Sequence, residues 1–396
     1  MLAWLLRARP RLTALTALSL GGLILGTLSG CSSPPAQTPT APAAPASAAS
    51  SPATSPAPEP ARVTLLRERS RWVAADWAEL PGWGDAALRP AWSALLRGCE
   101  RPAQGWAQLC QQARALEAQD PPDEATLRFW LIKQLQPYRV EDFQGQSSGL
   151  LTGYYEPELP AQRRAQGNFR VPLLSPDPQL RRLTRQQIDT QSPERLARAA
   201  LAWLEDPLDA LVVQIQGSGR LQLTEPDGST RWVRVAFAGH NDQPYQSIGR
   251  WLIQQGELQA SEASWPGIKD WVRRNPKQQR ELLWRNPRYV FFREEPLPDL
   301  KLGPRGAQGV PLTPGHSVAV DRLSVPYGTP LWLDSTEPLS STPLRRLVMA
   351  QDTGSAIVGA VRADFFWGWG REAEAQAGRM KQSLRLWALW PRQDTP

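Results

Sequence analysis

Two aspartates near the C-terminus, Asp352 and Asp364, lie close to a dense aromatic run. Asp364 is followed directly by Phe365-Phe366-Trp367-Gly368-Trp369. A carboxyl group that aromatic rings shield from water has a raised pKa, which suits a general acid. Aromatic rings also offer flat surfaces on which sugars pack. The combination predicts a cleft that binds and cleaves a saccharide.

The residues around Asp364 alternate as they would in a β-strand. Between positions 359 and 366 the apolar side chains share one face: Val361, Ala363 and Phe365. Arg362 and Asp364 fall on the opposite, open face, where the rings that follow would shield Asp364 from water. The alternative is a surface ion pair between Arg362 and Asp364 at a strand end, and such pairs are common. Spacing alone does not decide between these interpretations.

Two further segments carry side chains suited to sugar binding. Residues 149–157 read as a strand closed by a turn, with Thr152 and Tyr155 available for hydrogen bonds and ring stacking. The alternative there is an ordinary hairpin with core tyrosines. Gly217-Ser218-Gly219 lacks the third glycine and the following helix of a dinucleotide-binding motif. We expect instead a tight turn that brings Gln216 and Ser218 close to a ligand.

Helical and strand patterns alternate in the rest of the chain. Residues 83–140 are helical in pattern, and a helix after Asp120-Pro121-Pro122-Asp123 carries apolar residues at helical spacing: Leu127, Trp130, Leu131 and Leu135. Other expected helices cover residues 192–204, 265–283 and a stretch from about Tyr245. Expected strands cover residues 211–215, 288–292, 317–320 and 330–333, with a hairpin turning at Asp227-Gly228.

The N-terminus reads as a bacterial secretion signal. Three arginines open it, and the apolar run from Leu12 to Leu28 is too short and wrongly flanked for a transmembrane helix. The end of this run, Leu28-Ser29-Gly30-Cys31, looks like a lipobox, so we expect cleavage before Cys31 and lipidation of its thiol. The alternative is an uncleaved signal-anchor helix. Residues 32–61 are almost wholly Pro, Ala, Ser and Thr, and would form a tether reaching on the order of 90 Å.

Composition limits the classes of function. The formal charge of +7 falls to +4 once the signal, with three arginines and no acid, is removed. This mild basicity is spread along the chain, which disfavours nucleic acid binding and suits an anionic polymer such as a wall glycan. A solvated Arg-rich surface is an equal alternative. We expect no cofactor, and zinc has little support because His240 and His316 lie far apart and no CxxC pair exists.

Cys99 and Cys110 flank a turn that contains Pro102 and Gly105. Because an exported protein can keep a disulfide, we expect these two thiols to be joined. Two buried free thiols are the alternative.

Several motifs together resemble the MltA-type membrane-bound lytic murein transglycosylases, which contain a three-aspartate domain. They cover most of the chain beyond residue 140 and read AQDTGSAI, RADFFWGWGREAEAQAGRMK, SVAVDRLSVPYGTPLWL, GLLTGYYEPEL, VVQIQGSGRLQL, AFAGHNDQPYQSIGRWLI and NPRYVFFRE. By position the three acids fall on Asp321, Asp352 and Asp364, and the resemblance implies that Asp364 is the catalytic acid/base. The candidates for substrate binding are Thr152, Tyr155, Gln216, Ser218, Asn241, Tyr245, Phe366 and Trp367.

The resemblance implies a mainly β fold with helices. It would consist of a six-stranded double-psi β-barrel, like that of barwin and some endoglucanases, and a second β-domain inserted in it, with the cleft between the two. Composition alone predicts only a mixed, mostly β protein. The expected segments are a lipoprotein signal peptide (1–30), a tether (31–61), N-terminal helices with the first part of the barrel (62–156), the inserted β-domain (157–284) and the three-aspartate barrel domain (285–396).

The implied activity is cleavage of the β-1,4 bond between N-acetylmuramic acid and N-acetylglucosamine in peptidoglycan without water. The muramic acid's C6 hydroxyl closes onto C1 as a 1,6-anhydro ring, so one residue can protonate the leaving oxygen and then accept the hydroxyl proton. Asp321 and Asp352 would either raise the pKa of Asp364 as like charges or cap turns as structural acids. Hydrolysis on the same barrel and a non-catalytic peptidoglycan-binding lipoprotein are the alternatives.

A further resemblance, to the sorting signals of Gram-negative lipoproteins, implies a location. Ser32, rather than Asp, after Cys31 favours the outer membrane of a Gram-negative bacterium, where the lipid-anchored protein would face the periplasm. Its partner would be peptidoglycan glycan strands, with wall-synthesis or division proteins left open.

Overall fold

The computed structural model describes residues 62–392. The expected signal peptide, the lipidation site Cys31 and the tether lie outside the described residues. None of the described helices is both long and apolar enough to cross a membrane.

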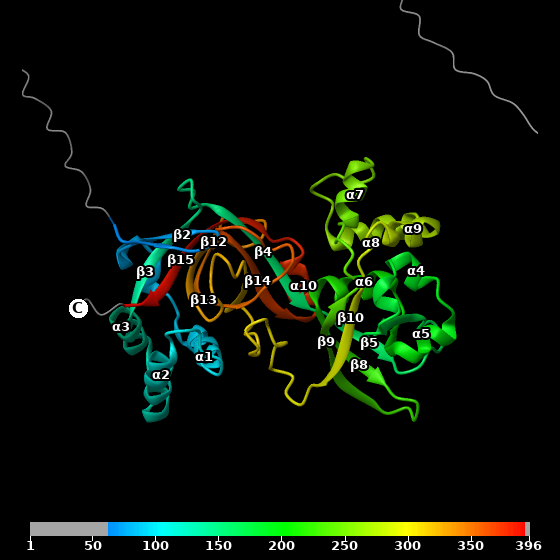
Figure 1. Cartoon of the computed structure of the whole chain (residues 1–396), viewed down its shortest axis with the longest axis horizontal. Helices are drawn as coiled ribbons and strands as arrows, with labels where there is room; N and C mark the ends of the chain where they lie inside the picture. Colours follow the sequence, from blue (N-terminus) through cyan, green and yellow to red (C-terminus); the bar gives the residue numbers. More distant parts are fainter. Residues whose placement is uncertain (1–61, 393–396) are drawn as a thin grey trace, which may run out of the picture. The chain divides into compact units, whose positions relative to one another are not determined.

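Six strands form a closed ring around an apolar interior, and their ribbons curve around the barrel in Figure 1. They are β4 Gly149–Glu156, β11 Ser317–Val320, β12 Pro330–Thr336, β13 Pro343–Asp352, β14 Arg362–Trp369 and β15 Lys381–Pro391. The order is β15-β12-β13-β11-β14-β4, and residues Lys381–Leu384 of β15 pair with β4 to complete the ring. The pairs β11–β13 and β14–β4 are parallel, and the other four are antiparallel. The barrel that the resemblance implied is thus confirmed.

Alternation along these strands fills the ring with apolar side chains. Ala363 and Phe365 of β14 are fully buried, as their spacing predicted. They pack in one cluster with side chains from all five remaining strands of the ring. The members include Leu151, Val318, Val320, Leu331, Leu333, Leu344, Val348, Leu384 and Leu386.

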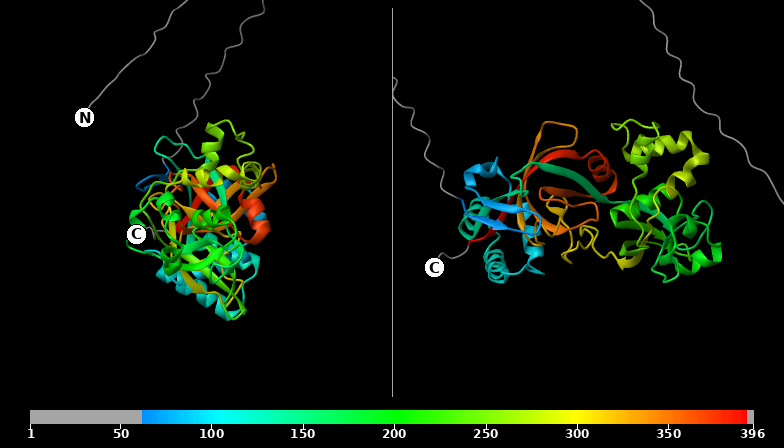
Figure 2. Two further views of the ribbon diagram at one scale, coloured as in Figure 1. Left: turned by 90° about the vertical axis from the view of Figure 1, so that its right-hand side faces the viewer. Right: turned by 45° about the horizontal axis from the view of Figure 1, so that its top comes forward.

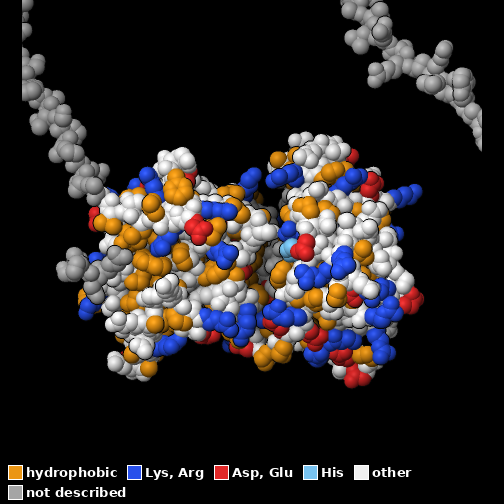
Figure 3. Space-filling model, in the orientation of Figure 1, with side chains coloured by type: hydrophobic (Ala, Val, Ile, Leu, Met, Phe, Trp, Pro, Cys, Tyr) orange, Lys and Arg blue, Asp and Glu red, His pale blue; other side chains and the backbone are white. Residues whose placement is uncertain are grey.

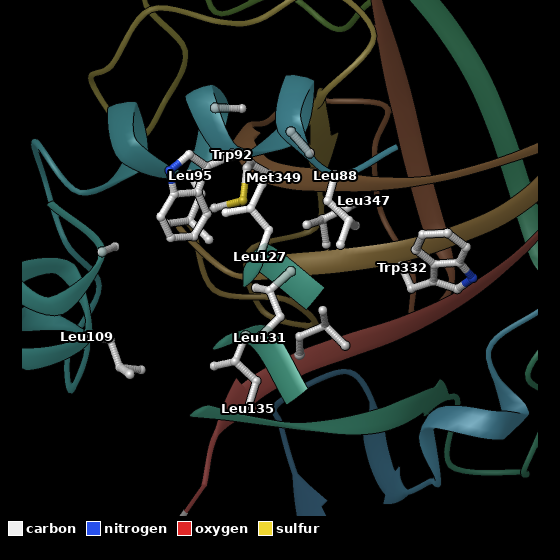
Figure 4. Packing of buried hydrophobic residues seen from close by; sticks show 14 of the residues in the cluster. Leu88, Trp92, Leu95, Leu109, Leu127, Leu131, Leu135, Trp332, Leu347 and Met349 are labelled. Atoms are coloured by element: carbon white, nitrogen blue, oxygen red, sulfur yellow. The ribbon is translucent and has the colours of Figure 1, made fainter. Parts of the chain in front are cut away.

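The second half of β15 extends the sheet away from the ring. Residues Trp387–Pro391 pair with β3 Leu135–Glu141, which pairs with β2 Arg71–Ala74, which pairs with β1 Thr64–Leu66. Three helices cover this extension: α1 Arg89–Gly98, α2 Ala107–Gln119 and α3 Glu124–Gln134. Leu88, Leu127 and Leu131 of this region belong to one apolar cluster with Trp332 and Leu347 of the ring, all of which Figure 4 labels. The helices therefore support the barrel through one continuous core, which burial of apolar surface stabilises.

The N-terminal helices agree with their sequence signals. The side chain of Asp123 accepts a hydrogen bond from the amide of Thr126 (2.8 Å) and so caps α3. Leu127, Leu131 and Leu135 are buried at the spacing that predicted a core face. The chain then passes directly into β3, so the helical pattern expected as far as residue 140 ends at Gln134. Cys99 and Cys110 form a disulfide between α1 and α2, with 5.3 Å between their Cα atoms.

A second, six-stranded sheet is inserted between β4 and β11 (Figure 2). Its strands are β5 Glu158–Gln162, β6 Val171–Leu174, β7 Ala200–Leu204, β8 Ser218–Thr224, β9 Thr230–His240 and β10 Val290–Pro296, in the order β10-β9-β8-β5-β7-β6. The turn at Asp227-Gly228 joins β8 to β9 as predicted, with Gly228 at a φ of 86°. The strand expected over residues 288–292 belongs to this sheet, because β10 pairs with β9. The expected boundary at residue 284 therefore falls before the last strand of the inserted sheet.

Seven further helices, in addition to α1–α3, accompany the two sheets within the described residues. They are α4 Arg185–Asp189, α5 Pro193–Ala199, α6 Pro207–Gln216, α7 Ile248–Gln254, α8 Trp265–Arg274, α9 Gln279–Trp284 and, between β14 and β15, α10 Gly370–Ala377. Four 3₁₀ turns add to these: Trp77–Glu79, Trp83–Asp85, Leu180–Arg182 and Pro276–Gln278. The helices expected over residues 265–283 and after Tyr245 correspond to α8–α9 and α7.

Two predictions in the inserted region were wrong. Residues 211–215, expected as a strand, lie in α6, which Asp206 caps at the amide of Leu208 (2.8 Å) and Gly217 ends at a φ of 81°. The apolar run is buried on most sides, and periodicity cannot separate such a helix from a buried strand. The helix expected over residues 192–204 ends at Ala199, and Ala200–Leu204 form β7.

Candidate active site

A cleft of about 740 Å³ lies between the barrel and the inserted sheet. The barrel side contributes Thr152, Tyr154, Asp352, Asp364 and Phe366. The inserted side contributes Gln216, Ser218, Phe237, His240, Tyr245 and Arg288, among others. Two loops, residues 304–307 and 353–357, complete the lining. The surface is hollowed between the two parts in the face that Figure 3 shows.

Strand register places the two acids in one row across four neighbouring strands. Ala319 of β11 is paired with Asp352 of β13 on one side and with Asp364 of β14 on the other. Asp364 is paired in turn with Thr152 of β4. Since adjacent strands lie about 4.8 Å apart, the Cα atoms of the two aspartates are separated by about 10 Å. Residues distant in sequence thus meet at one site because the barrel closes in this order.

Asp364 is held by a short chain of hydrogen bonds. The hydroxyl of Thr152 donates to Oδ1 of Asp364, and Nη2 of Arg362 donates to the Thr152 oxygen (2.9 Å). Because Thr152 receives the guanidinium on its oxygen, its own proton is directed to the carboxyl group. The Thr152 bond occupies one carboxyl oxygen, so the other, Oδ2, is the oxygen that can carry and transfer a proton.

Burial raises the pKa of Asp364 to about 6. The hydrogen bond from Thr152 and the charge of Arg362 lower this pKa, but the loss of solvent outweighs both of them. The nearby Asp352 raises the pKa further. A carboxyl group with such a pKa is protonated in part of the molecules near neutral pH, which a general acid requires.

Asp352 lies on the same wall and is fully engaged by donors. The hydroxyl of Tyr154 donates to Oδ2 (2.9 Å), the amide of Ala307 donates to Oδ1 (3.0 Å), and the amide of Thr353 adds a third bond. Burial raises the pKa of Asp352 although these donors favour its charged form. The backbone of Gly306 can pass Gln351 only without a side chain, because a Cβ there would lie 2.4 Å from the Gln351 carbonyl oxygen.

Asp321 does not line this cleft, and its carboxylate holds two loops. Its carboxylate accepts from the amides of Leu323 (3.0 Å) and Gly359 (2.9 Å) and from Nη1 of Arg69 (3.0 Å). Burial raises the pKa of Asp321, but the two amides and Arg69 outweigh that effect and lower it. Its geometry is that of a structural acid which fixes the segment before β14.

Comparison with known proteins places this geometry in a family. Residues 150–293 match the MltA specific insert domain, and residues 316–390 match the 3D domain. The membrane-bound lytic murein transglycosylase A of Vibrio cholerae serotype O1 is 30% identical over 285 residues, which are 66% of this chain and 74% of that protein. The chain belongs to the membrane-bound lytic murein transglycosylase A family.

Solved structures of this family share the fold. LtgG of Burkholderia pseudomallei, a lytic transglycosylase, is 43% identical, with a TM-score of 0.60 over 81% of this chain and 96% of that one. MltA from Neisseria gonorrhoeae is 32% identical, with a TM-score of 0.71 over 86% and 97%. Escherichia coli MltA with bound chitohexaose is 26% identical, with a TM-score of 0.65 over 78% and 91%.

Six of the eight residues expected to bind substrate line the cleft: Thr152, Tyr155, Gln216, Ser218, Tyr245 and Phe366. The ring of Phe366 packs on that of Tyr154, with 5.2 Å between their centroids. Gln216 also accepts a hydrogen bond from the amide of Tyr155 (3.1 Å), which links α6 to β4.

The other two expected residues, Asn241 and Trp367, lie elsewhere. Asn241 does not line the cleft: it is buried and bonds the carbonyl oxygens of Leu183 (2.7 Å) and Pro287 (2.9 Å). Trp367 does not line it either, because it shares the inner face of β14 with Phe365 and donates to the sulfur of Met380 (3.2 Å). Tyr155 lines the cleft, and its buried side chain also packs against α6 and α10.

Sequence reasoning missed Tyr154, which bonds Asp352. The signal was present, because alternation along β4 puts Thr152 and Tyr154 on one face and Tyr155 on the other. The same alternation along β14 separates Phe366 from Trp367. No group of three or more metal-ligating side chains occurs among residues 62–392.

Proposed function

We propose that the chain is a lytic murein transglycosylase that cleaves the bond between N-acetylmuramic acid and N-acetylglucosamine, with Asp364 as its acid/base. The observation that carries this proposal is the state of Asp364. It lies in the cleft with one oxygen occupied by Thr152 and with a pKa raised to about 6. Membership of the family supports the reaction type, and the E. coli relative with bound chitohexaose supports a saccharide in the cleft.

The proposed reaction needs one titrating group. Asp364 gives its proton to the glycosidic oxygen as the bond from that oxygen to C1 of muramic acid breaks. The C6 hydroxyl of the same sugar then forms a bond to C1, and its proton passes to the Asp364 carboxylate. No water is consumed, and Asp364 ends the cycle protonated. Holding the sugar with its hydroxyl near C1 supplies much of the remaining rate.

Asp352 supports this centre in the proposal, and Asp321 supports the fold around it. The charge of Asp352 helps to keep Asp364 protonated. Hydrogen bonds from Tyr154 and Ala307 hold the carboxyl group of Asp352 in position. Hydrolysis is the second candidate, because Asp352 is a second carboxyl group in the same cleft. A general base for water must accept a proton, however, and both oxygens of Asp352 already accept hydrogen bonds from Tyr154 and Ala307.

The products of the reaction test the proposal. The unit that spans Pro60–Pro396, incubated with purified peptidoglycan, should release 1,6-anhydromuropeptides. Mass spectrometry separates the outcomes, since products heavier by one water would mean hydrolysis. Release of nothing, with retention on the polymer, would mean a binding module.

We further propose that Cys31 anchors the protein to the outer membrane. The relatives are named membrane-bound, and Leu28-Ser29-Gly30-Cys31 in this chain looks like a lipobox. Cys31→Ala should abolish palmitate labelling and move the protein out of the membrane fraction, while the catalytic unit keeps its activity on soluble strands. Unchanged labelling and fractionation would contradict the anchor and favour a signal-anchor helix.

A further inference from the structure

The side chains that line the cleft include more positive than negative groups. Two acids, Asp352 and Asp364, are accompanied by five arginines: Arg185, Arg288, Arg293, Arg305 and Arg362. Lys and Arg side chains also gather beside the hollow in the face that Figure 3 shows. The hydroxyl and acetamido groups of the glycan backbone carry no charge, so sugar binding alone does not explain this excess of cations.

Three of these arginines have partners that account for them. Arg185 is buried and bonds the side chain of Gln214 and the carbonyl oxygens of Asn286 and Arg288. Arg293 forms an ion pair with Glu295 (2.7 Å). Arg362 belongs to the hydrogen-bond chain that ends on Asp364.

The other two arginines lack a carboxylate partner among residues 62–392. Arg288 donates from Nε to the carbonyl oxygen of Gln243 (2.8 Å) and from Nη1 to the hydroxyl of Ser355 (3.1 Å). Arg305 donates from Nη1 to the carbonyl oxygen of Gly309 (3.0 Å). A guanidinium has five N–H donors, so each keeps several that can bind an anion.

The positions of these two guanidinium groups suit a single ligand that starts at the acid centre and extends away from it. Arg288 precedes β10 on the inserted side, and its bond to Ser355 reaches the loop that follows Asp352. Arg305 lies two residues before Ala307, whose amide bonds Asp352. The pair therefore borders the acid centre from both walls of the cleft. A peptide of three residues that starts there would span about 10 Å when extended.

We propose that Arg288 and Arg305 bind the carboxylates of the stem peptides on muramic acid, so that the enzyme prefers peptide-bearing strands to bare glycan. The proposal rests on the lytic transglycosylase function proposed above. The stem peptide leaves muramic acid at its lactyl group, on the same sugar whose C1 bond is cut, and carries the free carboxylates of this polymer. Guanidinium groups match carboxylates in geometry and charge.

Three substrates separate charge recognition from peptide contact. They are uncrosslinked peptidoglycan strands, the same strands with their peptide carboxylates converted to amides, and strands stripped of peptides by an amidase whose newly freed lactyl carboxylates are also converted to amides. The full chain in detergent should turn over the first with a kcat/KM at least tenfold above that for either of the others. Each of Arg288→Gln and Arg305→Gln should lower that ratio roughly threefold to tenfold.

The control is Arg273→Gln on α8, which removes an arginine whose side chain is 77% exposed and paired with Asp270. This variant should keep the ratio of the wild-type protein. Equal turnover of all three substrates by the wild-type protein would overturn the proposal, as would equal losses by Arg288→Gln on all three. A preference shared by native and amidated strands would replace charge recognition with contact to the peptide backbone.

Binding tests the same inference without turnover. Asp364→Asn, mixed with each polymer in insoluble form and pelleted, should bind the native polymer more tightly than the amidated or stripped ones, and the addition of Arg288→Gln should reduce that difference. Failure of the wild-type protein to release product would count against the proposed function alone. Equal binding to the three polymers would count against stem-peptide recognition alone.

Discussion

Asp364 combines a stability cost with a chemical role, and one substitution separates the two. Folding raises its pKa from 3.8 to about 6, so between these values the folded state binds more protons than the unfolded state. The stability of the protein therefore falls as pH rises through that window. The cost arises because an ionised carboxylate at neutral pH has lost solvent that Thr152 and Arg362 only partly replace.

Asp364→Asn should fold and lose activity. The amide keeps the shape of the side chain but cannot transfer a proton, so release of anhydromuropeptides should fall by about 10⁴ or more, because the residue serves as both acid and base. At pH 7 the free energy of unfolding of the variant should exceed that of the wild-type protein by about 1–3 kcal/mol, and this difference should disappear near pH 4. Urea unfolding at the two pH values measures it.

The matched control for that variant is Asp270→Asn on α8, whose carboxylate is exposed and outside the cleft. It should leave turnover unchanged. Activity of Asp364→Asn within a few-fold of the wild-type protein would mean that Asp364 is merely a partner of Arg362. Asp352→Asn would then be the next variant to assay.

The pH dependence of turnover should report the same carboxyl group. The free enzyme must carry the proton on Asp364 before substrate arrives, so kcat/KM should fall about tenfold per pH unit above pH 6. Thr152→Val removes a hydrogen bond that lowers the pKa of Asp364, so its descending limb should move to higher pH. A profile flat from pH 5 to pH 8 in the wild-type protein would contradict an acid with this pKa.

At the scale of elements, the alternation of side chains along β4 and β14 predicts which residues face the cleft and which face the core. Period-two alternation placed Ala363 and Phe365 inside the barrel, and the same rule assigns Tyr154 and Phe366 to the cleft and Trp367 to the core. The wrong expectation for Trp367 came from treating the aromatic run as one surface. A strand presents neighbouring residues on opposite faces, so no run of consecutive rings can form one platform.

Other elements could not be predicted from local signals. The run 211–215 lies in a helix because Asp206 and Pro207 start it and Gly217 ends it, and the apolar residues alone are compatible with either structure. Asn241 has the polarity of a sugar ligand, but its partners are backbone carbonyls brought together by tertiary packing. The ring order that sets Asp352, Asp364 and Thr152 in one row depends on the pairing of Asp364 with Thr152, 212 residues away, and only the family resemblance indicated it.

At the scale of the whole molecule, one buried charge joins the barrel to the inserted sheet. Glu156 ends β4 and is fully buried. It accepts hydrogen bonds from Nε of Arg220 on β8 (2.7 Å) and from Nε of Arg234 on β9 (2.6 Å). Both arginines also bond the carbonyl oxygen of Leu302 in the segment that returns to the barrel. The walls of the cleft are therefore tied together through these three side chains.

Glu156→Gln should weaken this junction and, through it, the cleft. Removal of the carboxylate leaves the buried guanidinium of Arg234 without a counter-charge and leaves Arg220 with Glu158 alone (3.6 Å), and breaking a buried pair typically costs about 3–5 kcal/mol in the free energy of unfolding. Urea unfolding measures this loss, and Glu281→Gln, which breaks an exposed pair with Arg285 on α9, is the control that should change little. Because Glu156 lies outside the row of acids, the folded fraction should keep the descending pH limb near 6 while KM rises. A variant as stable as the wild-type protein, with an unchanged KM, would show that the two sheets keep their places without this charge.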